Sequence, residues 1–451
     1  MMTYVDFCEP FKGKKITVMG LGLLGRGVGD ATFLAECGAV VTVTDLKTEA
    51  ELSESVERLR AFDSIQFVLG EHRMEDFENC DMVLVAAGVP IDSPYLAHAR
   101  EKGIRLVQSA ALFAELSKIP IIGVTGTRGK STVTAMVHHV LSVVTGEHVI
   151  KGGNIRGVSN LQLLKDVKDD SLAVMELDSW QLQGFGWAEI SPQIAVFTNF
   201  MDDHLNYYKG DREAYFADKA NIFRYQEESG VFITTPTVFK EAKEFAKGKD
   251  ITLGQEVVLA DASVLPEDCL LAMPGEHNRL NAALAYEALK AVSLTDEEIF
   301  DGLASFPGVE GRLQYVQEVD GVKMYNDNNS TTPQATVAAL RALGDADRTN
   351  VVLIAGGNDK GIDNTELATE IARYCKRVVL MPGTGTDLLK AQLDDSVPSD
   401  TYETLEEAVK AALGAAAPGD IVLFSPGFTS FGMFKNEYER NDRFLDLIGA
   451  L

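Results

Sequence analysis

The hydrophobic positions of this chain fall into short apolar runs that alternate with glycine turns and amphipathic stretches. Uninterrupted apolar runs are typical of buried parallel strands, and the amphipathic stretches are typical of helices. In the first part of the chain, strands are predicted at Lys15–Met19, Val40–Thr44, Met82–Ala86 and Arg105–Val107. A predicted helix to about Cys37 separates the first two, so we expect a small α/β unit that ends near Gln108.

The same alternation occurs twice more along the chain. In the middle part, strands are predicted at Ile119–Val124, Leu172–Leu177 and Ile194–Thr198, and a helix at Leu280–Val292. In the last part, strands are predicted at Val322–Asn326, Val351–Ala355, Val378–Met381 and Ile421–Phe424, and helices at Pro333–Leu343, Thr365–Tyr374, Leu405–Leu413 and Phe434–Leu447. We therefore predict an α/β protein of three domains, residues 1–108, 109–308 and 309–451, each with a mostly parallel sheet flanked by helices.

Composition and charge exclude several classes of function and indicate where the protein works. The chain has 451 residues, 46% of them hydrophobic, and a net charge of −26, which argues against general binding of nucleic acid or anionic membranes. No apolar stretch reaches membrane-spanning length, and residues 1–6 lack a basic region followed by an apolar one. Five scattered cysteines indicate a reducing compartment. We expect a cytoplasmic enzyme with no nucleic-acid partner and no membrane insertion.

The segment Thr125-Gly126-Thr127-Arg128-Gly129-Lys130-Ser131-Thr132 lies between a predicted strand and a predicted helix. Glycines let the backbone N–H groups face phosphate oxygens, and the helix N-terminus adds a partial positive charge. Lys130 is placed to reach the terminal phosphates and Ser131 to bind Mg²⁺. Because Gly123 lies one position too early for the strict phosphate-loop pattern, a glycine turn with an exposed lysine is the alternative interpretation.

Polar residues also follow two other predicted strands. Glu176 ends one apolar run, and Asp202-Asp203-His204 follows another. Ligands of open parallel sheets bind beyond the carboxyl ends of strands, and Mg²⁺ prefers oxygen ligands, so Glu176 and His204 are candidate metal ligands. The alternatives are a solvent-facing carboxylate and a structural histidine.

Lys219 lies on a predicted helix over residues 211–223, on the same face as Tyr215, Phe216, Ile222 and Phe223. Burial would favour the neutral amine, which takes up CO₂ to form a carbamate able to bind metal. The pattern alone favours the alternative, a lysine that extends from the helix edge to solvent.

With these motifs in place, the chain resembles the Mur ligases, ATP-dependent amide-forming enzymes of peptidoglycan precursor synthesis, nearly from end to end. The loop matches their T-G-T-N-G-K-S/T except at Arg128, and Glu176, His204 and Lys219 match their E-x-S-S-x-Q-L, D-H and carbamylated-lysine positions. The resemblance also implies ATP contacts for His277, Asn278, Asn281, Arg312 and Asp327.

Within the resemblance, the Gly20–Gly25 turn points to the members that add glutamate to UDP-N-acetylmuramoyl-L-alanine. It implies that the UDP substrate is bound by Gly22, Leu23, Leu24, Asp45, Gly88 and Asn154. It implies that glutamate is bound by Thr331, Lys360, Ser430 and Phe431.

The resemblance further implies a Rossmann-like UDP-binding domain, a central P-loop ATPase-like domain and a Rossmann-like C-terminal domain that binds glutamate. Catalysis would use Lys130, His204 and Lys219, with two Mg²⁺ ions held by Ser131, Glu176, His204 and the carbamate of Lys219. The expected reaction is ATP-dependent ligation of D-glutamate through an acyl phosphate, by a monomer.

One departure from the family motif leaves open which enantiomer of glutamate is the acceptor. Asn329 stands where these ligases usually have lysine, which removes a positive charge near the glutamate pocket, so L-glutamate is an alternative acceptor. Gly20-x-Gly22-x-x-Gly25 with Asp45 also fits an NAD-dependent dehydrogenase, but that function leaves the second loop, Glu176 and Lys219 unexplained. Folylpolyglutamate synthase lacks such a first domain, and retention of Lys130 and Lys219 argues against a non-catalytic regulatory module.

Overall fold

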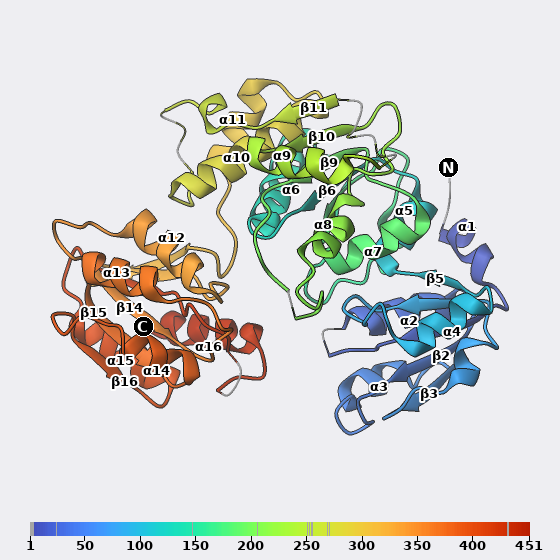
Figure 1. Cartoon of the computed structure of the whole chain (residues 1–451), viewed down its shortest axis with the longest axis horizontal. Helices are drawn as coiled ribbons and strands as arrows, with labels where there is room; N and C mark the ends of the chain where they lie inside the picture. Colours follow the sequence, from blue (N-terminus) through green and yellow to red (C-terminus); the bar gives the residue numbers. More distant parts are fainter. Residues whose placement is uncertain are drawn as a thin grey trace. The chain divides into compact units, whose positions relative to one another are not determined.

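The computed structural model of the chain describes residues 4–23, 25–146, 148–204, 206–249, 251, 253, 256–267, 269, 271–430 and 433–451. Within these residues the strands form three sheets, which follow one another along the chain from blue to red in Figure 1. The chain divides into two compact units, Met1–Val264 with Asn281–Gly302, and Leu265–Leu280 with Leu303–Leu451. The first two sheets belong to the first unit and the third sheet belongs to the second.

The strands of the first sheet are β1 (Lys15–Met19), β2 (Val40–Asp45), β3 (Ile65–Leu69), β4 (Met82–Val85) and β5 (Arg105–Val107). Its helical segments are α1 (Tyr4–Cys8), η1 (Glu9–Phe11), α2 (Arg26–Glu36), α3 (Ser53–Leu59), η2 (Met74–Phe77) and α4 (Pro94–Glu101). The strand order is β3-β2-β1-β4-β5, with every pair parallel. The order reverses between β1 and β4, so the glycine turn after β1 opens at a switch point where such sheets bind ligands.

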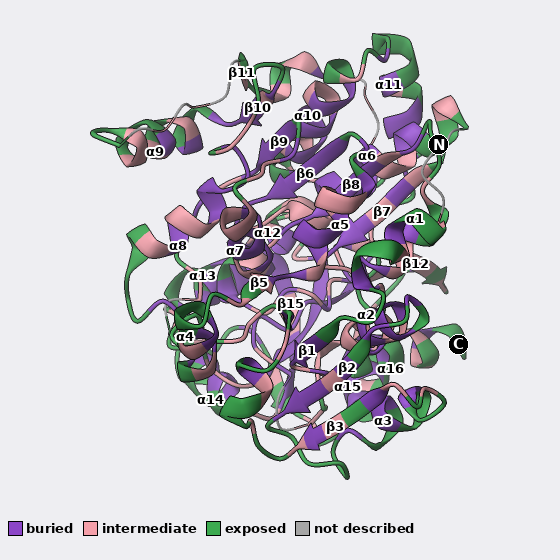
Figure 2. Cartoon of the chain, turned by 90° about the vertical axis from the view of Figure 1, so that its right-hand side faces the viewer, coloured by how far each residue is buried: buried purple, intermediate pink, exposed green. Residues whose placement is uncertain are grey.

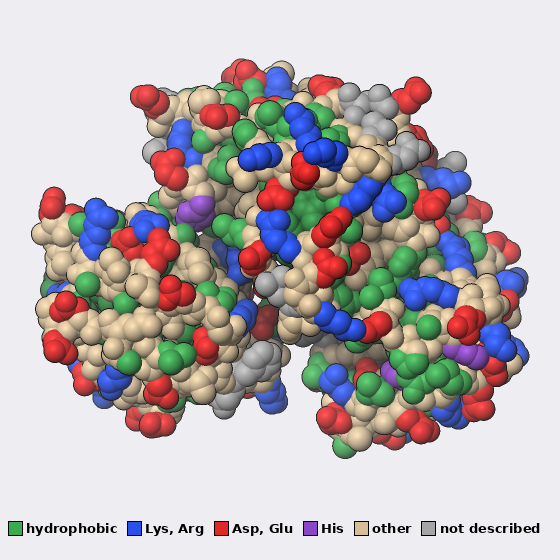
Figure 3. Space-filling view, in the orientation of Figure 1, with side chains coloured by type: hydrophobic (Ala, Val, Ile, Leu, Met, Phe, Trp, Pro, Cys, Tyr) green, Lys and Arg blue, Asp and Glu red, His purple; other side chains and the backbone are tan. Residues whose placement is uncertain are grey.

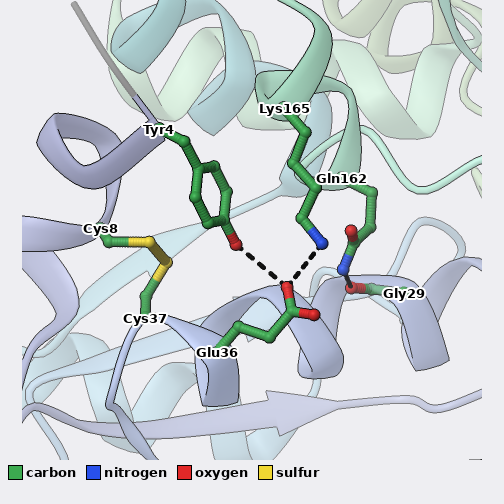
Figure 4. The surroundings of a disulfide bond; sticks show 7 residues. All are labelled: Tyr4, Cys8, Gly29, Glu36, Cys37, Gln162 and Lys165. Atoms are coloured by element: carbon green, nitrogen blue, oxygen red, sulfur yellow. Dashed lines mark hydrogen bonds and ion pairs between the residues drawn. A yellow bond between two sulfur atoms is a disulfide. The ribbon is translucent and has the colours of Figure 1, made fainter.

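A disulfide between Cys8 and Cys37 ties α1 to the end of α2 (Figure 4). Beside it, the Tyr4 hydroxyl donates a hydrogen bond to Glu36 Oε2 at 3.0 Å, and Lys165 Nζ lies 2.7 Å from the same oxygen. This disulfide contradicts the inference of a reducing compartment from the scattered cysteines. Its two members are 29 residues apart and become neighbours only when α1 packs on α2.

The strands of the second sheet are β6 (Ile121–Thr125), β7 (Val149–Gly153), β8 (Leu172–Glu176), β9 (Ile194–Phe197), β10 (Val231–Thr234) and β11 (Glu256–Leu259). The helical segments of this part of the chain are α5 (Ser109–Ser117), α6 (Lys130–Thr145), η3 (Gln162–Asp166), α7 (Ser179–Ala188), α8 (Arg212–Ala220), α9 (Pro236–Ala246), η4 (Ala262–Val264), α10 (Glu276–Ala291) and α11 (Asp296–Ala304). The parallel order β11-β10-β9-β6-β8-β7 places β6 between β9 and β8. The two polar strand ends found in the sequence therefore flank the strand that carries the glycine loop.

The strands of the third sheet are β12 (Gln314–Val319), β13 (Val322–Asn326), β14 (Val351–Gly356), β15 (Cys375–Met381), β16 (Ser399–Thr401) and β17 (Ile421–Phe424). Its helices are α12 (Pro333–Leu343), α13 (Thr365–Tyr374), α14 (Thr384–Lys390), α15 (Leu405–Ala415) and α16 (Glu437–Gly449). The order is β12-β13-β17-β14-β15-β16, in which only β12 runs antiparallel to its neighbour among the described strands.

The fold confirms the predicted α/β class of three mostly parallel sheets. Strands β6 and β14 are buried along their whole length, which explains why their apolar runs were visible in the sequence. β6 is drawn in purple in Figure 2. The short edge strand β3 was missed because only Ile65 and Val68 of its five residues are buried. Among the described residues, no helix combines the length and apolar character that crossing a bilayer requires.

Candidate active site

The loop after β6 has the backbone that a phosphate cradle requires. Gly126 and Gly129 have positive φ angles of 142° and 81°. A Cβ at Gly126 would lie 2.0 Å from Thr198 Oγ1, and one at Gly129 would lie 2.4 Å from Asn281 Oδ1, so both positions require glycine. α6 begins directly after the loop at Lys130, and the N-terminus of a helix suits an anion because its N–H groups and its dipole point toward it.

The residues after β9 hold this loop in place. Thr198 Oγ1 and Asn199 Nδ2 donate to the Arg128 carbonyl at 2.5 and 3.1 Å, and the Arg128 N–H donates to Asn199 Oδ1 at 2.8 Å. The Arg128 guanidinium lies 3.6 Å from Asp203 Oδ2. The residue that departs from the ligase motif therefore pairs with the carboxylate next to His204.

Two lysines reach into the loop from different helices. Lys130 Nζ donates to the carbonyls of Gly126 and Thr127, each at 3.1 Å. Lys219 Nζ donates to the Gly126 carbonyl at 2.9 Å, and Lys219 is 2% exposed. Burial lowers the pKa of Lys219 well below its usual value, and the charge of Lys130 lowers it further. The alternative in which Lys219 extends to solvent is therefore wrong.

His204 stands beside the loop in a left-handed backbone conformation with φ of 54°. Its N–H donates to Asp203 Oδ1 at 2.9 Å, and its ring centroid lies 4.7 Å from that of Trp180. Burial lowers the pKa of His204, Asp203 opposes this, and the charges of Lys130 and Lys219 add to it. The neutral imidazole that binds metals is thereby favoured.

Glu176 is the last residue of β8 and is 7% exposed. Its carbonyl accepts a hydrogen bond at 2.7 Å from the N–H of Asn154, whose side chain accepts one at 2.7 Å from Arg26 of α2. Among the described residues, no three Asp, Glu, His or Cys side chains converge as a preformed metal site. The metal roles of Glu176, His204, Lys219 and Ser131 therefore stay predictions.

A hollow of about 720 Å³ opens beyond β1 in the first unit. Gly20–Leu23, Asp45 and Gly88 line it, and four of the residues predicted for the UDP substrate (Gly22, Leu23, Asp45 and Gly88) are among them. Asp45 shapes the turn, since its Oδ2 accepts hydrogen bonds from the N–H groups of Leu21 and Gly22 at 2.9 and 3.2 Å. Leu24, also predicted for this site, lies outside the described residues.

The residues predicted for the adenine side begin α10. The Asn281 side chain faces Gly129 of the loop, within the first unit. His277 and Asn278 belong to the second unit, where Asn278 is buried and His277 is exposed.

Arg312 and Asp327 lie together in the second unit. The Asp327 carboxylate accepts hydrogen bonds from the Leu313 N–H at 3.0 Å and the Ser425 hydroxyl at 2.8 Å. Burial raises the pKa of Asp327 to about 7, although both hydrogen bonds and the charge of Arg312 oppose that rise. The two predicted ATP contacts therefore lie close enough for the charge of Arg312 to favour the ionised carboxylate of Asp327.

The residues predicted for glutamate lie in the second unit. Lys360 Nζ donates to Thr331 Oγ1 at 3.4 Å. Ser430 lines a cavity of only about 10 Å³ beside Gly357 and Arg440. Phe431 lies outside the described residues.

Sequence reasoning missed Arg440, a buried cation beside the predicted glutamate residues. Arg440 is 1% exposed and donates to Asn328 Oδ1 at 2.8 Å and to the Asn328 carbonyl at 2.9 Å. Its signal was present in the spacing, because Arg440 lies four residues before Phe444 and eight before Ile448, on the buried stripe of α16.

Comparisons with known proteins match this chain over nearly its whole length. Sequence profiles described as the MurD-like N-terminal domain, the Mur ligase middle domain and the Mur ligase glutamate ligase domain match residues 14–108, 124–289 and 311–428. A protein of Roseiflexus sp. (strain RS-1) named UDP-N-acetylmuramoylalanine–D-glutamate ligase is 38% identical over 97% of this chain and 98% of its own length. The chain belongs to the Mur ligase family.

Other members of the family extend the match. A protein of Acetivibrio thermocellus with the same name is 32% identical over 99% of this chain and 98% of its own length. The crystal structure of UDP-N-acetylmuramate-alanine ligase from Thermotoga maritima matches with a TM-score of 0.61 at 19% identity, over 97% of this chain and 99% of that one, which supports the fold. As a Mur ligase, the chain is an ATP-dependent amide-forming enzyme that requires Mg²⁺, and the dehydrogenase alternative is wrong.

Proposed function

We propose that this Mur ligase adds D-glutamate to UDP-N-acetylmuramoyl-L-alanine at the expense of ATP, in peptidoglycan precursor synthesis. The full-length relatives described above are named for this reaction. One structural observation carries the proposal: the first unit holds both a hollow at the β1 switch point and a glycine loop flanked by the polar ends of β8 and β9.

The reaction proceeds in two steps. An oxygen of the L-alanyl carboxylate attacks the γ-phosphorus of ATP, ADP leaves, and an acyl phosphate forms. The amine of glutamate then attacks the acyl carbon, loses a proton and expels inorganic phosphate, which leaves an amide. Positioning and charge stabilisation account for most of the catalysis in the first step.

Lys130 is placed to serve the first step. Its ammonium group donates to two loop carbonyls, and a γ-phosphate in the cradle offers it stronger, charged acceptors. Ser131 and Thr132 follow on the first turn of α6, and Thr125, Gly126, Thr127 and Gly129 form the cradle itself. We assign these residues and Arg128 to the ATP phosphates.

The donor set fits Mg²⁺, because Glu176 supplies a carboxylate and burial favours a neutral His204. Mg²⁺ neutralises charge on the phosphate oxygens when bound. We assign Lys219 as a carbamate that adds a further carboxylate to this set, since the amine that reacts with CO₂ is the neutral form favoured by its burial.

The acceptor pocket is assigned to Thr331, Lys360 and Ser430 of the second unit. Lys360 is the cation for one glutamate carboxylate and is already aligned with Thr331. Asn329 keeps its amide at the Glu310 carbonyl, 3.4 Å away, so the usual second lysine charge is replaced by a neutral group. The names of the relatives favour D-glutamate over L-glutamate.

We further propose the domain limits 1–108, 109–308 and 309–451, a monomeric state and a cytoplasmic location. UDP-linked substrates and ATP are cytoplasmic metabolites, which supports the location. The three sheets support the division into domains, with one in each range.

The experiment that tests the function measures phosphate release and product mass with the purified full chain. ATP, Mg²⁺ and UDP-N-acetylmuramoyl-L-alanine are combined with D-glutamate or L-glutamate, and each component is omitted in turn. Release is expected only with the complete D-glutamate mixture. Release with L-glutamate alone would overturn the stereochemistry, and release with neither isomer would overturn the function.

A further inference from the structure

A second hollow, of about 380 Å³, lies in the first unit and shares no lining residue with the larger one. Its wall includes Arg100 and Arg105 near β5, Glu115 of α5 and Trp187 of α7. The volume falls near the lower end of the range for small-molecule sites, roughly 300–1,000 Å³. None of the motifs assigned above uses these side chains.

The charge of this wall is positive in a chain of net charge −26. Arg105 Nη2 lies 2.6 Å from Glu115 Oε1, so these two charges balance each other. The net positive charge of the wall therefore comes from Arg100. Arg100 is exposed, and within the described residues no carboxylate lies within 4 Å of its guanidinium. The Arg100 guanidinium donates one long hydrogen bond, from Nη1 to the Ile91 carbonyl at 3.5 Å, and its charge is not neutralised by that contact. A guanidinium without a carboxylate partner is a strong partner for a carboxylate or a phosphate.

The same wall offers a flat aromatic surface. The Arg100 guanidinium carbon lies 5.6 Å from the centroid of the Trp187 indole, which is half-buried. Tryptophan beside arginine binds planar rings by stacking and by cation–π contact. The apolar side chains of Ile104 and Leu106 complete this part of the wall.

The hollow adjoins the reaction site through one helix. α7 carries Trp187 at its end, and it carries Trp180, which contacts His204, in its first turn. At Gly184, between them, the N–H donates to Gln108 Oε1 at 3.1 Å, and Gln108 lines the larger hollow. Trp187 also packs against the core of the first sheet, so a ligand on it contacts the junction of the first two sheets.

We propose that this second hollow binds a small anion that carries a flat aromatic ring, of the nucleoside monophosphate class, and that the ligand changes the affinity of the larger hollow for its substrate. Arg100 pairs with the anionic group and Trp187 stacks on the ring. The binding half stands on the hollow alone, and the effect on the substrate rests on the proposed function.

The chain has two tryptophans, so Trp180→Phe leaves Trp187 as its sole indole. AMP, UMP and inorganic phosphate are titrated into this full-length variant while Trp187 emission is recorded. Both nucleotides are expected to quench the emission, and phosphate is expected to bind at least about ten-fold more weakly because it cannot stack. Calorimetric titration of the unmodified chain repeats the measurement without the Trp180 change.

Arg100→Ala is expected to weaken nucleotide binding about ten-fold or more. The matched control is Arg373→Ala, which removes an arginine that lies 5.1 Å from the Tyr374 ring in the second unit and should leave binding unchanged. Absence of binding, equal binding by phosphate alone, or binding unaffected by Arg100→Ala overturns the site.

The effect on the substrate is measured separately. A saturating nucleotide that binds the hollow should change the KM for UDP-N-acetylmuramoyl-L-alanine in the parent and leave it unchanged in Arg100→Ala. Binding without any change of KM overturns the coupling, while failure of the ligase assay itself would count against the proposed function and leave the binding result intact.

Discussion

The side-chain nitrogen of Lys219 is buried against the Gly126 carbonyl, in the same loop that Lys130 contacts. Two cations in one cradle are costly unless one is neutral or an anion joins them. A carbamate on Lys219 would reverse its charge and remove this repulsion. The closeness of the two lysines is therefore consistent with the carbamate proposed for Lys219 and with the phosphate contact proposed for Lys130.

Lys219→Ala is predicted to lower the rate of phosphate release by roughly 100-fold or more, because a carboxylate that orients the metal is lost. Short carboxylic acids such as formate should restore part of that rate. Lys219→Arg, which keeps a cation but cannot form a carbamate, is the control and should be inactive without rescue. Full activity of Lys219→Ala without additives would rule out the carbamate role.

Arg128 joins the loop to Asp203 through an ion pair at 3.6 Å. Its replacement by the asparagine usual in the family is predicted to raise the KM for ATP several-fold, since a cation near the phosphates is lost. Because the pair is partly exposed, the unfolding midpoint should hardly change. Steady-state kinetics of Arg128→Lys, which keeps the charge, should give a KM for ATP between those of the parent and Arg128→Asn. An unchanged KM for ATP would show that the arginine serves only the loop.

At the scale of elements, one face of α2 ties the first sheet to the second. Arg26 bonds to Asn154, the Gly29 carbonyl accepts from Gln162 Nε2 at 3.0 Å, and Asp30 Oδ1 accepts from the Ser159 hydroxyl at 2.6 Å. A Cβ at Gly29 would lie 2.4 Å from Ser159 Cβ, so the helix can approach this closely only with glycine there. The register of α2 against residues 154–162 is fixed by these contacts.

Burial raises the pKa of Asp30 to about 6, although the Ser159 hydrogen bond opposes the rise. The folded state therefore holds this proton more tightly than the unfolded state, and the contribution of Asp30 to stability falls as pH rises from about 4 to about 6. Asp30→Asn does not lose stability in this way, because an amide does not titrate in this pH range. From pH 5 to pH 7 its stability relative to the parent is predicted to increase by roughly 1 kcal/mol.

Urea unfolding at both pH values measures this change. Asp166→Asn on η3 removes an exposed carboxylate and is the matched control, which should follow the parent at both pH values. A difference between Asp30→Asn and the parent that stays constant with pH would show that Asp30 does not titrate in this range.

At the scale of the whole molecule, the predicted UDP contacts that the structure describes fall in the first unit, and the described glutamate contacts fall in the second. Positive and negative side chains are interspersed on the face of the chain shown in Figure 3, where acidic groups recur on all three coloured regions of Figure 1. With a net charge of −26, the anionic substrates depend on local cations such as Lys130 and Lys360.

Calorimetry is therefore predicted to show two unfolding transitions with separate ligand responses. UDP-N-acetylmuramoyl-L-alanine at 100 times its Kd should stabilise the first unit by about 2.7 kcal/mol, and D-glutamate should stabilise only the second. Leu353→Ala, in the core of β14, identifies the second transition by lowering it. A single transition shifted by both ligands would contradict independent units.

Much of the fold was predictable because parallel sheets bury their strands on both faces. β1, β5 and β13 match their predicted bounds, and α12 and α13 do as well. Two of the strands that were missed, β3 and β12, lie at sheet edges, where partial exposure breaks the apolar run. β10, a run of four residues, was missed although it lies inside the second sheet. Boundaries shifted where a cap decides them, as at α16, which begins after Asn436 accepts from the N–H groups of Tyr438 and Glu439.

The sequence by itself determined the α/β class, the glycine loop and the polar strand ends, because each depends on residues adjacent in the chain. Only the tertiary structure decided that Lys219 is buried, that Arg128 pairs with Asp203, and that Arg100 and Trp187 line one hollow. Such contacts join residues far apart in sequence, and they depend on strand order and helix packing, which local patterns do not specify.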